Sequence, residues 1–227
     1  MKRPFLLPGL IGMIALVFAS LISAPLKNHS FHCQPPFTIP MLGLEFIGST
    51  EALQAFFGTE GRPARMEAME SALGRDFLFI LAYSFYLIAF AHTIFRQRQK
   101  RRYLLLALLA ACIGLADIFE NGSIKMLMEQ LQKQPGAEVQ AVDFHRLHFF
   151  TWTKWLGLVV YFAATIPFLR RAGRLGQILA FAALGVSLLG LTAVFNQNWI
   201  ERYALSVFLL FPLTVLFCFL QRNPNYP

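Results

Sequence analysis

Long apolar segments, separated by shorter polar ones, dominate the pattern of this chain. A helix needs about 20 mostly apolar residues to cross a bilayer core of about 30 Å, and six segments reach or approach that length. These segments are residues 5–24, 77–95, 103–121, 149–169, 175–195 and 203–220. The pattern predicts an all-α fold, a polytopic membrane helical bundle of about six transmembrane helices. Residues 1–227 are expected to form a single integral membrane domain.

The composition agrees with a membrane protein. Of the 227 residues, 56% are hydrophobic and only 14% are charged, whereas soluble domains carry about 25% charged residues. This balance excludes a disordered chain, a collagen-like fibre and a disulfide scaffold. The chain has 3 cysteines and no Cys-x-x-C pattern, so neither thiol-redox chemistry nor a zinc ribbon is expected.

Basic residues are distributed unevenly between the two sets of loops. One set, with both tails, holds 11 basic residues and no acidic ones, namely Lys2, Arg3, Arg96, Arg98, Lys100, Arg101, Arg102, Arg170, Arg171, Arg174 and Arg222. The net charge of +8 therefore divides into +11 on this side and −3 on the other. Because basic short loops remain in the cytoplasm, we expect cytoplasmic termini and outer loops at about 25–75 and 123–148. Nucleic acid is not an expected partner. The expected partners are the lipid bilayer and its anionic headgroups, which the basic residues at 96–102 would contact.

The first segment has two interpretations. Met1-Lys2-Arg3 is a basic start, and Ser23-Ala24 offers the small residues of a signal-peptide cleavage site. Pro25 follows directly, however, and Ile22 occupies a position where a small residue is needed. We therefore expect an uncleaved membrane anchor, whereas cleavage would leave five spans with the N-terminus outside.

Both outer loops carry short amphipathic patterns. Ser49 or Thr50 can cap a helix that ends near Gly58, and a second helix is expected from Pro63, free to continue into the second span. In the other loop, apolar positions between 124 and 131 predict a third short helix, followed by a turn at residues 135–136. These helices either pack on the outer end of the bundle or form a lid over a cavity.

Three polar residues share one face of the third span. Asp117, Glu120 and Asn121 are spaced by three and four residues, which places them together on a helix. Gly114, one turn earlier, permits close approach by a neighbouring helix. An acid within a span costs about 2.5–3.5 kcal/mol, so these acids require partners.

Partners are expected at the same depth on two other spans. Asp117 lies 14 residues after Tyr103, or about 21 Å along the helix, in the outer third of the bilayer. Lys154 on the fourth span lies at that level, and Asp76 and Tyr83 enter it from the second span. This predicted polar layer is either a ligand-binding site or an ion-pair network that fixes the packing of the helices.

Two histidines near the outer end of the fourth span raise the question of a metal site. His145 and His148 lie three apart at the expected height of Asp117 and Glu120, so a zinc site with a carboxylate is conceivable. The segment lacks His-Glu-x-x-His, and its aromatic residues also fit a membrane-interface belt. No metal site is favoured and no cofactor is predicted.

Several short motifs resemble those of uncharacterised bacterial multi-pass inner-membrane proteins. The motifs are Arg-Asp-Phe-Leu-Phe at 75–79, Ala-Tyr-Ser at 82–84, Asp-x-x-Glu-Asn at 117–121 and the single lysine Lys154 of the next span. The resemblance covers about half of the chain and implies a bacterial inner-membrane location without an activity. A fainter similarity to ceramidase-like intramembrane hydrolases is limited, because that family has seven spans and another histidine spacing.

The leading hypothesis is binding or handling of a small polar or amphiphilic ligand, or a lipid, at the outer leaflet. Lys154 would meet an anionic group or pair with Asp117, while Glu120 and Asn121 would orient the ligand. The alternative is an intramembrane hydrolase or transferase with Asp117 or Glu120 as general base, with or without a metal at His145 and His148. A third hypothesis is a structural or membrane-assembly protein.

Overall fold

The computed structural model describes residues 3–133 and 138–221, and this part of the chain is helical without strands. Its elements are α1 (Leu6–Ile22), η1 (Ala24–Leu26), α2 (Pro40–Glu45), α3 (Thr50–Phe57), α4 (Arg62–Arg98), α5 (Arg102–Lys133), α6 (Ala141–Leu169), α7 (Gly173–Phe195), η2 (Gln197–Trp199) and α8 (Ile200–Leu220). Within the described ranges, six helices are long and apolar enough to cross a membrane, namely α1 and α4 to α8. The predicted all-α membrane bundle is confirmed, and the protein is an integral membrane protein.

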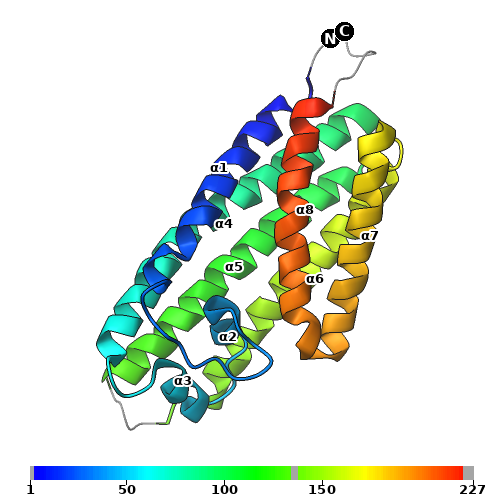
Figure 1. The fold of residues 1–227 in the computed structure, drawn as a ribbon. Helices are drawn as coiled ribbons and strands as arrows, with labels where there is room; N and C mark the ends of the chain where they lie inside the picture. The colour runs from blue at the N-terminus through cyan, green and yellow to red at the C-terminus, as the bar shows by residue number, and fades with distance from the viewer. Residues whose placement is uncertain (1–2, 134–137, 222–227) are drawn as a thin grey trace.

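The long helices pack mainly against their neighbours in the chain. α4 packs on α5, α5 on α6, α6 on α7 and α7 on α8, while α1 packs against both α4 and α8. Figure 1 shows the start of α1 and the end of α8 at one end of the bundle, with α2 and α3 at the opposite end. The turns from α4 to α5 and from α6 to α7 lie at the same end as the start of α1. The bundle therefore has one end of short turns and one end covered by short helices.

α4 and α5 are much longer than a membrane span. With 37 and 32 residues, they extend about 55 and 48 Å at 1.5 Å per residue, against a bilayer core of about 30 Å. The separate helix predicted at 124–131 is therefore wrong, because this segment continues α5 through Gly122. The turn predicted at 135–136 lies outside the described residues.

A second hydrophobic cluster explains why α5 continues past Gly122. Ile124, Leu127 and Leu131 are almost fully buried there, against side chains of α3, α4 and the start of α6. Burial of three large side chains, at about 1.5–3 kcal/mol each, outweighs the cost of about 1 kcal/mol for a glycine within a helix. A membrane-side cluster and this outer cluster thus share the three long helices α4, α5 and α6.

α3 packs against the outer end of the bundle. The Ser49 hydroxyl accepts a hydrogen bond from the Ala52 amide at 3.2 Å, as expected for a helix cap. Leu53, Phe56 and Phe57 are buried in the outer cluster. Packing on the bundle is one of the two arrangements expected for the outer helices, and α3 shows it.

Glycines bring α5 close to both of its neighbours. A Cβ at Gly114 would lie 2.1 Å from Ser84 Oγ of α4, and a Cβ at Gly157 of α6 would lie 2.5 Å from Ile113 Cγ1. Both distances are too short for any larger residue. The close approach predicted at Gly114 therefore holds, and it brings α4, α5 and α6 together next to Asp117.

Candidate functional site

Lys154 of α6 lies at the centre of a buried group of carboxylates. Its Nζ atom is 3.1 Å from Glu45 Oε2 and 3.2 Å from Asp117 Oδ1, and it also donates a hydrogen bond to Glu120 Oε2. Asp117 and Glu120 come from the same face of α5, as their spacing predicts. One ammonium group on α6 therefore contacts three carboxylates from two other helices, α2 and α5.

The remaining predicted residues extend this group towards α4. The Tyr83 hydroxyl donates to Asp117 Oδ2 at 2.7 Å, and Asn121 Nδ2 donates to Asp76 Oδ2 at 2.8 Å. The structure thus places all six predicted residues of the polar layer side by side. We call the complete set the polar cluster; its members are Glu45, Asp76, Tyr83, Asp117, Glu120, Asn121, Thr151, Lys154 and Trp155.

Three members of the polar cluster were missed by the sequence analysis. Glu45 ends α2 in the first outer loop, Thr151 donates to Glu120 Oε1, and Trp155 Nε1 donates to Glu45 Oε2 at 3.0 Å. Only Glu45 had a signal in the sequence, because it is the one Asp, Glu, Lys or Arg between Lys27 and Glu51. An isolated charge in an apolar stretch is a candidate for burial with a partner.

The polar cluster is withdrawn from solvent and rich in acids. Glu120 is 0% exposed, Asp117 and Lys154 are each 6% exposed and Glu45 is 8% exposed, while Asp76 is half-buried. Burial raises the pKa of the Glu45 carboxyl above its ordinary value; Lys154 opposes that rise, and Asp117 adds to it. Four carboxyl groups and one ammonium group share this site, so the ionisable groups are not matched one to one.

Five polar contacts hold the α2 segment, residues 38–47, over the polar cluster. At its start, Glu201 of α8 accepts hydrogen bonds from the Thr38 amide and hydroxyl and from the Ile39 amide, the latter at 2.8 Å. At its end, His148 Nε2 lies 2.9 Å from the Ile47 carbonyl oxygen, and the Thr151 hydroxyl is 3.2 Å from the Glu45 carbonyl oxygen. α2 itself packs on α5 and α6, in front of them in Figure 1.

The two histidines considered as metal ligands are not brought together with the acids. His145 is exposed, and His148 is hydrogen-bonded to the Ile47 carbonyl. In residues 3–133 and 138–221, no group of three or more His, Cys, Asp or Glu side chains is arranged to hold a metal ion.

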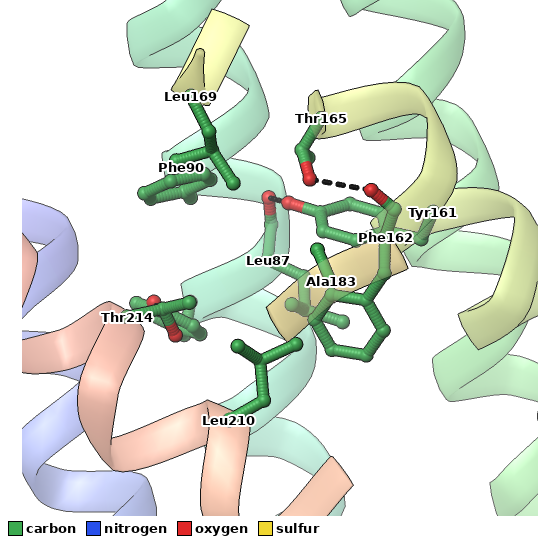
Figure 2. Close-up of a pocket in the computed structure, with 10 residues that line it drawn as sticks. Leu87, Phe90, Tyr161, Phe162, Thr165, Leu169, Ala183, Leu210 and Thr214 are labelled. Carbon is green, nitrogen blue, oxygen red and sulfur yellow. Dashed lines mark hydrogen bonds between the residues drawn. The ribbon is translucent and has the colours of Figure 1, made fainter. Parts of the chain in front are cut away.

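A small cavity lies in the bundle between α4, α6, α7 and α8, and none of its lining residues belongs to the polar cluster. Figure 2 shows its lining, which includes Tyr161, Thr165 and Thr214, and the hydrogen bond of 2.7 Å from the Tyr161 hydroxyl to the Leu87 carbonyl. The Tyr86 hydroxyl, also in the lining, donates to Thr214 Oγ1 at 2.8 Å. With a volume of about 10 Å³, the cavity is at the lower limit for one water molecule and too small for an organic ligand.

Comparisons with protein-family models, with curated proteins and with solved structures each find no match. Any functional assignment therefore rests on the residues of the polar cluster and on their position in the bundle.

Proposed function

We propose that the protein binds a small polar or amphiphilic ligand at the polar cluster, on the extracytoplasmic side of the membrane. The supporting observation is the excess of four carboxyl groups over one ammonium group. A structural ion pair needs one carboxylate, and each further buried acid costs free energy that packing alone does not require. Ionisable residues within membrane-spanning segments are most often functional.

The depth of the polar cluster favours an amphiphilic ligand. Asp117 follows the start of α5 at Arg102 by 15 residues, or about 22 Å along the helix axis. With Arg102 at the cytoplasmic surface, Asp117 lies in the outer third of a bilayer core of about 30 Å. A ligand at this level would place its polar group in the cluster and its apolar part among the lipid chains or the apolar side chains of the bundle.

The orientation of the protein is part of the proposal. Both Arg-rich turns lie at the end of the bundle where α1 starts and α8 ends (Figure 1), so one orientation places all of these basic residues in the cytoplasm. This favours cytoplasmic termini in a bacterial inner membrane, with the polar cluster on the outer side. Exposed Lys100, Arg101 and Arg102 are then suited to anionic lipid headgroups. Because α4 and α5 run unbroken through both hydrophobic clusters, we further propose a single integral membrane domain.

The alternative of an intramembrane hydrolase or transferase receives no specific support. As a general base, Asp117 or Glu120 would need an open path to a substrate, and both carboxylates instead contact Lys154. If the role is purely structural, substitutions in the polar cluster should lower the stability of the protein and should not change the binding of any ligand.

Three single-chain amphiphiles that differ only in their headgroup test the proposal. Hexadecanoic acid, hexadecanol and hexadecyltrimethylammonium are added to the purified full-length protein, and bound ligand and melting temperature are measured. At least one should bind and raise the melting temperature, since a ligand at about 100 times its Kd adds about 2.7 kcal/mol of stability. Asp117→Asn removes one negative charge beside Lys154, so it should change the Kd for that amphiphile at least tenfold.

Glu70→Gln is the matched control, because Glu70 is an exposed acid of α4 outside the polar cluster, 3.9 Å from Lys125. This variant should bind as the unaltered protein does. The proposal fails if none of the three amphiphiles binds, or if Asp117→Asn and Glu70→Gln bind them equally well.

A further inference from the structure

Two hydrogen-bond donors on α6 converge on a single carboxylate oxygen. Lys154 Nζ and Trp155 Nε1 lie 3.1 and 3.0 Å from Glu45 Oε2. The Trp155 indole is fixed in place by its packing on Tyr203, with ring centroids 5.4 Å apart, and the Lys154 Nζ atom lies 5.0 Å from the centroid of the same indole. This pair of buried donors forms a preorganised receptor for an anionic oxygen.

The carboxylate in this receptor comes from outside the membrane-spanning helices. Glu45 is the last residue of the six-residue helix α2, whereas Asp117 and Glu120 belong to the long helix α5. Release of the Glu45 side chain would therefore involve α2 and not α5, which carries the other two carboxylates.

The position vacated by Glu45 would accept only certain groups. A buried indole N–H and an ammonium group face it, and leaving either without an acceptor is costly. A carboxylate satisfies both donors and replaces the Glu45 charge one for one, so the net charge of the polar cluster does not change. An alkylammonium group has no acceptor for these two donors and would be repelled by the Lys154 cation. A hydroxyl group could accept a hydrogen bond, but it would not replace the negative charge of Glu45.

We propose that Lys154 and Trp155 form a carboxylate-binding subsite that Glu45 occupies in this structure, and that the ligand is a carboxylate-bearing amphiphile that displaces Glu45. This inference rests on the proposed function and specifies the chemical class of its ligand. Glu45 thereby acts as a built-in competitor, which holds the subsite closed until the amphiphile arrives.

Removal of the competitor and removal of one donor have opposite consequences for the binding of hexadecanoic acid. In Glu45→Ala, the Kd of the full-length protein for hexadecanoic acid should fall at least tenfold, because no internal carboxylate must be displaced. In Trp155→Phe, which keeps a ring against Tyr203 but lacks the N–H donor, the Kd should rise about tenfold or more, as expected for loss of a hydrogen bond to a charged group. The Kd for hexadecanol should change less than threefold in both variants.

Glu51→Ala is the matched control, because Glu51 is an exposed acid of α3 in the same outer loop, and this variant should leave the Kd for hexadecanoic acid unchanged. If Glu45→Ala fails to fold, Glu45→Gln, which keeps the size and the Trp155 hydrogen bond but not the charge, should still lower that Kd. An unchanged or raised Kd in the folded Glu45 variant, or an unchanged Kd in Trp155→Phe, overturns the inference. Binding of only hexadecanol or hexadecyltrimethylammonium would overturn the carboxylate subsite and leave the proposed function standing.

Discussion

At the scale of single residues, Lys154 is the cation that offsets the free-energy cost of burying the carboxylates of the polar cluster. Two of its carboxylate partners, Asp117 and Glu120, lie on the preceding span. The third, Glu45, is more than a hundred residues away in the sequence. The contacts of Lys154 with Asp117 and Glu120 were predictable from the sequence, because all three residues lie at similar depth on neighbouring spans. The contact with Glu45 was not predictable, because the local sequence pattern does not indicate where a helix of a loop packs.

Lys154→Met should destabilise the protein by about 3–5 kcal/mol, because it leaves buried carboxylates without their cation. Adding Asp117→Asn removes one of these unpaired charges, so the double variant should regain a substantial part of the loss. The free energy of unfolding, measured by denaturation in detergent, checks this non-additivity. Lys125→Met, which removes one partner of an exposed pair, should change stability by no more than about 1 kcal/mol. Strictly additive effects would show that Lys154 and Asp117 are not energetically coupled.

At the scale of elements, the α2 segment is held by hydrogen bonds at its two ends and by burial of Leu42, Leu44, Phe46 and Ile47 in the two hydrophobic clusters. A six-residue helix is unstable in isolation, so its position depends on Glu201 at the start and on His148 and Thr151 at the end. The sequence left packing and a lid as alternatives for the outer helices, and the structure shows α2 packed over the polar cluster.

Glu201→Ala should loosen the start of the α2 segment, because it removes the acceptor of the Thr38 and Ile39 amides. Hydrogen exchange of these two amides should accelerate about tenfold, as expected for loss of hydrogen bonds to a charged group of about 1.5–3 kcal/mol. The amides of α3, which is capped by Ser49, should exchange at their former rate. The control is Glu129→Ala, which removes an exposed pair with Lys133 on α5. Equal exchange in the two variants would contradict a role for Glu201 in holding the segment.

At the scale of the whole molecule, α4 and α5 join a membrane-side core to an outer core, and the polar cluster lies along the helices that both cores share. In the proposed orientation, the outer core lies on the extracytoplasmic side. The six spans were predictable because each is long and apolar enough to be recognised by itself. The outward extension of α4 and α5 was only partly predictable, because the outer segments of these helices contain a glycine and many polar residues.

Cysteine labelling in intact cells tests the proposed orientation. In a background with Cys33→Ser, Cys112→Ser and Cys218→Ala, Glu60→Cys should react with a membrane-impermeant maleimide in intact cells. Lys100→Cys in the same background should react only after the inner membrane is permeabilised. Both positions are exposed, so a difference in labelling reports the side of the membrane rather than burial. The opposite labelling pattern would place the polar cluster on the cytoplasmic side.

The sequence by itself determined the helical class, the number of spans, the asymmetry of charge and the shared polar face of Asp117, Glu120 and Asn121. All of these follow from local length, composition and helical periodicity, which act between residues a few positions apart. Only the tertiary structure decided that α5 continues through Gly122, that α2 docks on α5 and α6, and that Glu45 reaches Lys154 and Trp155. Those features depend on burial and on hydrogen bonds between segments far apart in the chain, where packing free energy outweighs local preference.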